Sequence, residues 1–222
     1  MNNRVRSAVK LDFYTVKASM RTSVIMLVIA VIVGLATRMP LFSIMFTMVF
    51  VVLIGGMVFQ AHEKAGSGKL YGILPLKKSE MIAGRYLYAL AVGAIGLVIA
   101  CIIGIIITLI LKQPLNMLVI GSYLAIGFAY FGFAVGVSYP IYLKFSFAKA
   151  YVFTMLPMYL IVIIVVFVYR SMSRGGSINA SQITQFISDY GYLIPIIGAV
   201  VGLAFLAISA AIANLIYTQK EI

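Results

Sequence analysis

Residues able to carry acid–base, metal or nucleophilic chemistry are few in this chain of 222 residues. The only histidine, His62, adjoins Glu63, and the only cysteine, Cys101, lies inside an apolar run. A metal centre or an active site needs several such side chains converging on one point. We therefore expect no catalytic residue and no metal site in this chain. We interpret His62 as a structural or interfacial residue and Cys101 as a packing residue.

The glycine-rich run at 65–69 has only a superficial likeness to a phosphate-binding loop. That motif needs a glycine five residues before its Gly-Lys pair and a serine or threonine after it. Glu63 and Leu70 occupy these positions, and no strand pattern precedes the run. We expect no nucleotide to bind to this chain.

Apolar runs make up most of the sequence. Hydrophobic residues account for 64% of the chain and charged residues for 10%, and the mean hydropathy is +1.13. A soluble domain has about 45–50% apolar residues, and a helix needs about 20 apolar residues to cross roughly 30 Å of hydrocarbon. The pattern predicts one all-α membrane domain over residues 1–222. Its six expected transmembrane helices are at 22–37, 41–60, 83–111, 116–143, 150–169 and 192–217.

The distribution of lysine and arginine predicts how these helices are oriented. Cationic residues accumulate on the cytoplasmic side of membrane proteins. If the N-terminus lies inside, the cytoplasmic side holds Arg4, Arg6, Lys10, Lys17, Arg21, Lys64, Lys69, Lys77, Lys78, Arg85, Lys144, Lys149 and Lys220. The other side holds only Arg38, Lys112, Arg170 and Arg174. We therefore predict cytoplasmic termini, an internal loop at 61–82 and an external loop at 170–191, and we attribute the net charge of +12 to topology rather than to nucleic-acid binding.

Charged residues inside a span are costly and usually functional. The five acidic residues all fall in predicted connections or near the termini, and no basic residue clearly lies inside a span. A proton- or sodium-coupled carrier generally uses such a carboxylate relay. The sequence therefore argues against a carrier of that class.

Two segments outside the spans have helical amphipathic patterns. Within 1–21, apolar residues recur at three- and four-residue spacing beside a cationic side, which predicts an interfacial helix lying along the membrane. Its apolar positions are Val5, Val9, Phe13, Val16 and Met20. Within 181–190, Ile183, Phe186, Ile187 and Tyr190 predict a short external helix, which could close an exit path or rest on the membrane surface.

Small residues at four-residue spacing predict helix faces that pack closely. They occur at Gly96, Ala100 and Gly104, at Gly132 and Gly136, and at Gly198 and Gly202. Such faces suit packing within the chain or an oligomer interface, and we favour the first. Pro157 and Pro195 could kink their helices, although Pro195 could also lie in a first turn.

Two motifs resemble those of the permease subunits of type-2 ABC exporters. Glu63 after the second span, then Leu74-Pro75-Leu76, Lys78 and Arg85-Tyr86-Leu87, is similar to that family's acidic, Leu-Pro-aliphatic and basic-Tyr-Leu pattern. The run from Pro140 to Phe145, followed by Lys149, is similar to its Pro-x-Tyr-x-Lys-Phe-Gly segment, with Ser146 in place of the glycine. The resemblance covers essentially the whole chain.

The resemblance implies a division of labour. ATP and Mg²⁺ would bind separate ATPase subunits, two permease chains, identical or homologous, would enclose the path, and this chain would carry no cofactor. The 63–80 segment would couple the permease to the ATPase, and 144–149 would form a second cytoplasmic loop, with Lys144 and Lys149. The expected coupling contacts are Glu63, Lys69, Leu74, Pro75, Lys77 and Lys78.

Within that family, the chain looks most like small permeases of the bacterial cell membrane that export amphipathic cytolytic peptides, the phenol-soluble modulins. Spans rich in methionine, aromatic and aliphatic residues suit an amphipathic or lipid-like substrate better than a small ion. The alternative is a non-transporting immunity or sensor protein that binds toxic peptides. A co-purifying ATPase would separate the two hypotheses.

Overall fold

The computed structural model describes residues 9, 12–14, 20–64, 78–173, 185 and 189–218. Within these residues the chain is helical and contains no strand. The helices are α2 (Met20–Thr37), α3 (Pro40–Lys64), α5 (Lys78–Ile110), α6 (Met117–Lys144), α7 (Phe147–Thr154), α8 (Leu156–Ser173) and α10 (Leu193–Thr218). The prediction of an all-helical protein is thus confirmed for the described part of the chain.

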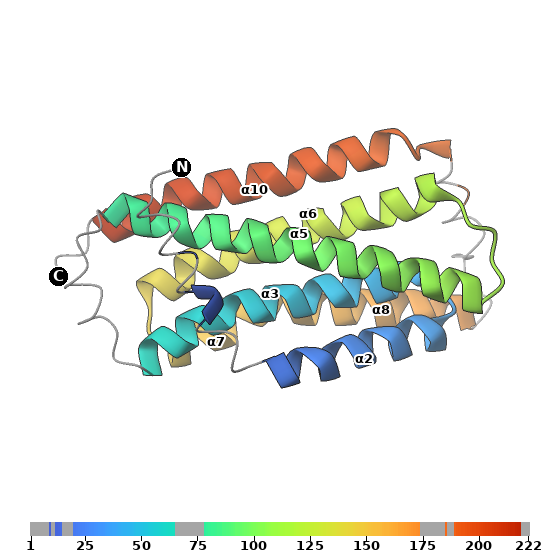
Figure 1. Cartoon of the computed structure of the whole chain (residues 1–222), viewed down its shortest axis with the longest axis horizontal. Coiled ribbons are helices and arrows are strands. Elements are labelled where there is room, and N and C mark those ends of the chain that lie inside the picture. Colours follow the sequence, from blue (N-terminus) through green and yellow to red (C-terminus); the bar gives the residue numbers. More distant parts are fainter. Residues whose placement is uncertain are drawn as a thin grey trace.

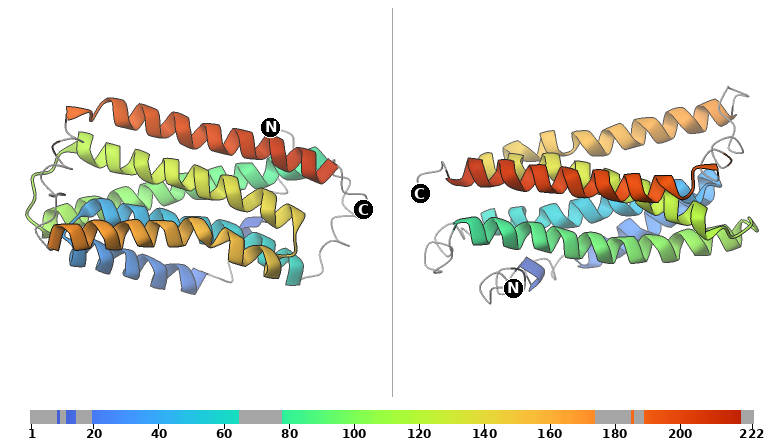
Figure 2. Two further views of the ribbon diagram at one scale, coloured as in Figure 1. Left: turned by 180° about the vertical axis from the view of Figure 1, so that it is seen from behind. Right: turned by 90° about the horizontal axis from the view of Figure 1, so that it is seen from above.

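The helices lie side by side along the long axis of the molecule, and successive ones run in alternating directions, except that α7 and α8 run in the same direction (Figure 1). At the left-hand end of Figure 1, α3, α6 and α10 end and α5 begins. At the opposite end, α2, α5 and α8 end and α3, α6 and α10 begin, and both views of Figure 2 agree. We call these the Glu63 end and the Lys112 end, after a residue that lies at each.

Four helices in the described residues are long and apolar enough to cross a membrane. They are Pro40–Ala61, Glu80–Ile110, Met117–Lys144 and Leu193–Ile216. At 1.5 Å of rise per residue, each exceeds the roughly 30 Å of a hydrocarbon core. Shorter apolar helical segments occur at Val24–Thr37 and Lys149–Ile164. Every predicted apolar stretch is therefore helical, while a count of six spans stays a prediction.

The predicted span at 150–169 is two helices rather than one. α7 ends at Thr154, α8 begins at Leu156, and the N–H of Met155 is shared between the carbonyl oxygens of Tyr151 and Phe153. Pro157 follows two residues later and has no N–H to continue the ladder. The predicted kink at Pro157 thus appears as a break between two helices, whereas Pro195 lies in the first turn of α10.

α2 and α3 form a tight hairpin. Only Arg38 and Met39 separate them, and Pro40 occupies the first position of α3, where its missing N–H costs nothing. The buried Ser43 hydroxyl donates a hydrogen bond of 2.8 Å to the carbonyl oxygen of Ala30. This bond joins the two helices about one turn into α3 and about two turns before the end of α2.

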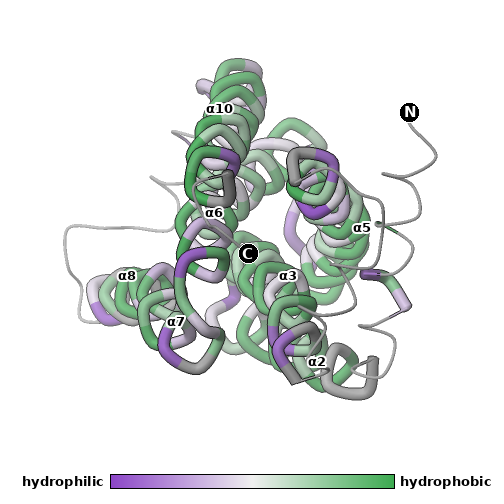
Figure 3. The backbone as a smooth tube through the Cα atoms, turned by 90° about the vertical axis from the view of Figure 1, so that its left-hand side faces the viewer, coloured by the Kyte–Doolittle hydropathy of each residue, from purple (hydrophilic) through white to green (hydrophobic). Residues whose placement is uncertain are grey.

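The core lies around α3 and α6, which occupy the middle of the bundle when it is viewed along its length (Figure 3). Its buried side chains include Ile44, Met48 and Val51 from α3 and Phe131 and Val135 from α6. The outer faces of α2, α5, α8 and α10 carry many exposed large hydrophobic residues. Such surfaces are unusual for a water-soluble monomer and suit contact with lipid.

The small-residue faces pack within the chain. A Cβ atom at Gly198 would lie 2.7 Å from the carbonyl oxygen of Ala125, and one at Gly202 would lie 2.8 Å from the ring of Phe128. These glycines bring the backbones of α6 and α10 into contact. On α5, the missing side chains of Gly96 and Gly104 leave room for the side chains of Val51 and Ile44 of α3, respectively. The preference for intrachain packing at these glycines is confirmed.

Parts of the predicted loops are helical, and other parts lie outside the described residues. In the 61–82 loop, residues 61–64 belong to α3 and 78–82 to α5, whereas 65–77 are not among the described residues. The same holds for most of the 1–21 helix and of the 181–190 helix. Among the N-terminal residues that are described, Val9 packs against the core and the ring of Phe13 meets that of Tyr88 edge-on at 4.9 Å.

Candidate functional site

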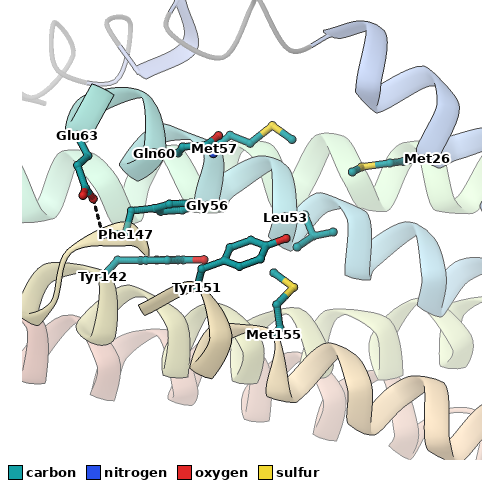
Figure 4. A pocket seen from close by; sticks show the side chains of 10 residues that line it. All are labelled: Met26, Leu53, Gly56, Met57, Gln60, Glu63, Tyr142, Phe147, Tyr151 and Met155. Carbon is teal, nitrogen blue, oxygen red and sulfur yellow. Dashed lines mark hydrogen bonds between the residues drawn. The ribbon is translucent and has the colours of Figure 1, made fainter. Parts of the chain in front are cut away.

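The carboxylate of Glu63 connects two helices at the Glu63 end. It lies in the last turn of α3 and accepts a hydrogen bond from the backbone N–H of Phe147, the first residue of α7 (Figure 4). Ser146, at the N-cap of α7, makes no side-chain capping bond. The first N–H groups of a helix lack partners within the helix and favour a negative charge. Glu63 therefore caps α7 from another helix.

This contact joins two segments that are separate motifs in the sequence, the one that begins at Glu63 and the one that begins at Pro140. Glu63 represents the acidic position after the second apolar stretch, and Phe147 lies in the segment that follows the Pro140–Phe145 run. Positions 63 and 147 are 84 residues apart. No pattern in one sequence could have indicated this pairing.

Aromatic rings from three helices stack beside this cap. Tyr142 of α6 stacks on Phe59 of α3, with ring centroids 5.0 Å apart, and on Phe147 of α7 at 5.2 Å. The Tyr142 hydroxyl also forms a hydrogen bond of 2.7 Å with the hydroxyl of Thr154 at the end of α7. Stacked aromatic pairs contribute stabilising free energy beyond that of their buried area, so these rings hold α3, α6 and α7 together.

Arg85 is a buried cation next to the same rings. Its side chain is 8% exposed, and its Cζ atom lies 4.5 Å from the ring centroid of Phe59. Such a cation–π contact gains strength when water is excluded. Arg85 lies seven residues after the start of α5, near the Glu63 end of the candidate span Glu80–Ile110, so the prediction that no charged residue lies inside a span stays a prediction.

A chain of hydrogen bonds joins α5, α10 and α6 near Arg85. The hydroxyl groups of Tyr86 and Ser209 are 2.5 Å apart, and the Ser209 hydroxyl donates to the carbonyl oxygen of Gly136 at 2.8 Å. Buried polar groups of this kind are satisfied by one another, which fixes the relative positions of the three helices. The Glu63 end is therefore a connected polar and aromatic layer.

A cavity of about 600 Å³ opens beside this layer, between α2, α3, α6, α7 and the connection to α8. Figure 4 shows its lining as a mixture of sulfur-containing, aromatic and polar side chains. The lining residues are Met26, Leu53, Gly56, Met57, Gln60, Glu63, Tyr142, Phe147, Tyr151 and Met155. Gln60 and Glu63 are three residues apart and so share one face of α3. No pattern in the sequence indicates this cavity.

The structure places some of the expected coupling residues near one another. Lys144 and Lys149 are exposed beside the Glu63–Phe147 contact, and Lys78 begins α5 at the same end. The other expected contacts, Lys69, Leu74, Pro75 and Lys77, lie outside the described residues. Within the described part of the chain, no group of three or more His, Cys, Asp or Glu side chains could hold a metal ion.

Comparison with known families identifies the chain. The profile of the family described as "ABC-2 family transporter protein" matches residues 9–218. The chain belongs to this ABC-2 family. It is therefore a multi-pass membrane protein and a transport component that is not itself catalytic, since ATP hydrolysis in such a transporter occurs in a separate ABC ATPase subunit. No curated protein matches this ABC-2 chain.

Proposed function

We propose that this ABC-2 protein is the permease subunit of an ATP-driven exporter that moves amphipathic cytolytic peptides, such as phenol-soluble modulins, out of a bacterial cell. The match over residues 9–218 is the observation that carries the permease assignment. The substrate class is supported by the cavity at the Glu63 end, where flexible methionine side chains and aromatic rings lie beside two polar groups. Methionine-rich surfaces adapt to varied apolar shapes. Two permease chains, identical or homologous, would enclose the path.

In this proposal the chain crosses the membrane six times, with the Glu63 end in the cytoplasm. The alternating helix directions support an even number of crossings (Figure 1). The cations support the orientation. The Glu63 end holds Lys64, Lys78, Arg85, Lys144 and Lys149, whereas the Lys112 end holds Arg38, Lys112 and Arg170.

Cysteine labelling tests this orientation. In a Cys101→Ala background, Lys112→Cys and Lys144→Cys each place one thiol at an exposed position, at opposite ends of the bundle. We expect a membrane-impermeant maleimide to label position 112 in intact cells and position 144 only after permeabilisation. The reverse pattern would invert the proposed orientation, and labelling of both positions in intact cells would contradict an odd number of crossings between them.

We further propose that the 63–80 segment transmits movement of the ATPase pair. Leu74 and Pro75 act as packing contacts, and Lys69, Lys77 and Lys78 as charged docking contacts. The hydrogen bond from Phe147 to Glu63 supports this route, because it ties the last turn of α3 to α7 immediately before residues 65–77. Movement of this segment would thereby reach the aromatic stack.

Purification from the native membrane tests the proposed function. The tagged full-length chain is isolated in a mild detergent, its partners are identified by mass spectrometry, and ATPase turnover is measured. We expect an ABC ATPase to co-purify and to show vanadate-sensitive turnover that amphipathic peptides stimulate. A clean oligomer that binds such peptides without any ATPase would instead favour an immunity or sensor protein.

A further inference from the structure

The cavity at the Glu63 end has a charge opposite to that of the protein as a whole. The chain contains 17 lysine and arginine residues against 5 acidic residues. Yet Glu63 is the one charged residue among the described residues that line the cavity. The amide of Gln60, one turn away on the same face of α3, adds a neutral polar group. A cavity with this lining favours a positively charged group.

The aromatic lining favours the same kind of group. Tyr142, Phe147 and Tyr151 all line the cavity beside Glu63 (Figure 4). The exposed faces of such rings attract ammonium groups within about 6 Å of the ring centroid. Tyr142 is already stacked on Phe59 and Phe147. The exposed ring of Tyr151 is therefore the better placed for this contact. The backbone N–H of Phe147 occupies one oxygen of the Glu63 carboxylate, Oε2. A carboxylate accepts several hydrogen bonds, so Glu63 can cap α7 and contact an ammonium group together.

The other side of the cavity is mainly apolar, although the hydroxyl of Tyr151 points toward Leu53 in Figure 4. In Figure 4, Met26, Leu53 and Met155 lie on the side away from Glu63 and Gln60. A ligand that satisfies both sides therefore carries an ammonium group next to an apolar chain. A volume of about 600 Å³ holds a few side chains rather than a whole peptide. Its size is within the roughly 300–1,000 Å³ that is usual for ligand pockets.

We propose that this cavity binds an ammonium-bearing, apolar part of the exported peptide, namely a lysine side chain or the terminal amine with its apolar neighbours. Glu63 is the anionic contact, and the methionines and Leu53 hold the apolar part. The inference rests on the proposed function. It adds that the exported peptide must carry an ammonium group next to apolar residues. Because the same carboxylate caps α7 and lies at the start of the 63–80 segment, binding of the ammonium group acts on both.

A fluorescence titration tests the proposal directly. The probe is an 18-residue amphipathic leucine–lysine helix with one tryptophan, and its partner is the same peptide with every amine acetylated. The protein itself contains no tryptophan, so it adds no tryptophan fluorescence to that of the peptide. Binding is measured to the full chain in nanodiscs of phosphatidylcholine, and the signal from empty nanodiscs is subtracted. We expect the lysine peptide to bind about tenfold more tightly, as a charge-assisted contact predicts.

Three variants locate this preference. Glu63→Gln keeps an acceptor for the Phe147 N–H but removes the charge, so the two peptides should bind equally. Glu80→Gln removes the same charge from the first turn of α5, outside the cavity, and should keep the tenfold difference. Gly56→Leu places a side chain in the cavity, where its Cβ would make only ordinary contact, 3.4 Å from the Tyr142 hydroxyl. It should weaken binding of both peptides.

Two outcomes would overturn the proposal. One is a tenfold preference that survives in Glu63→Gln, or an affinity for both peptides that is unchanged in Gly56→Leu. The other is displacement of the peptide signal by phosphatidylethanolamine with no preference between the two peptides, which would assign the cavity to lipid. If peptides stimulate the co-purified ATPase but the variants leave the half-maximal peptide concentration unchanged, the cavity assignment fails and the exporter stands. If binding depends on Glu63 but no peptide stimulates the ATPase, the exporter fails instead.

Discussion

The Gly132→Leu variant is expected to lose about 3 kcal/mol of stability, because overpacking a close contact between two backbones forces the helices apart. A Cβ atom at Gly132 would collide with the carbonyl group of Gly202, 2.8 Å from its carbon and still closer to its oxygen. A side chain in the way could rotate, but backbone atoms of α10 cannot. We expect the unfolding temperature in detergent to fall by several degrees and the monodisperse fraction on size exclusion to shrink.

Gly121→Leu is the matched control. Gly121 lies on the same helix, α6, and a Cβ atom there would meet nothing within 4 Å. The substitution should change stability by less than about 1 kcal/mol, since leucine has the better helix propensity and an open site. Equal unfolding temperatures for the two variants would contradict the α6–α10 contact that the structure shows.

Replacing Leu74, Pro75, Lys77 and Lys78 together by alanine is expected to abolish peptide-stimulated ATPase activity of the complex. In the proposed mechanism these side chains carry the contact through which the permease and the ATPase respond to each other. Insertion should be intact, since none of the four lies in the apolar stretches predicted at 41–60 and 83–111. The measurement compares ATPase turnover with and without peptide, on complexes matched for permease content in the membrane.

A matched control exists at the opposite end of the molecule. Lys112, Pro114 and Leu115 are exposed in the connection between α5 and α6 and have similar chemistry to the loop residues. Their replacement by alanine should leave stimulation at the level of the native protein. Stimulation that persists in the loop variant would remove the coupling role from the 63–80 segment.

The spans were predictable because bilayer thickness sets their length. The predicted stretch at 116–143 coincides with α6 (Met117–Lys144) to within one residue at each end, and that at 192–217 coincides equally well with α10 (Leu193–Thr218). Prediction was weaker where polar residues continue a helix. α3 extends to Lys64 and α5 begins at Lys78, because helical geometry does not stop where the apolar composition stops.

The site was less predictable than the spans. Glu63 was selected from the sequence as a coupling residue, and the structure shows that it caps α7. The stack of Phe59, Tyr142 and Phe147 involves three helices, so its members have no common spacing in the sequence. The burial of Arg85 likewise depends on Phe59 of α3. Periodicity identifies faces of single helices, but it does not identify which faces meet.

The hairpin of α2 and α3 bears on how the protein enters the membrane during synthesis. Its first helix has an apolar segment, Val24–Thr37, that is short for a stable crossing, whereas Pro40–Ala61 is long enough by itself. Given the Ser43–Ala30 hydrogen bond and the two-residue connection, we expect the longer helix to carry the shorter one into the bilayer as a preformed pair. In the six-span arrangement, this insertion event would move a single charged residue, Arg38, across the membrane.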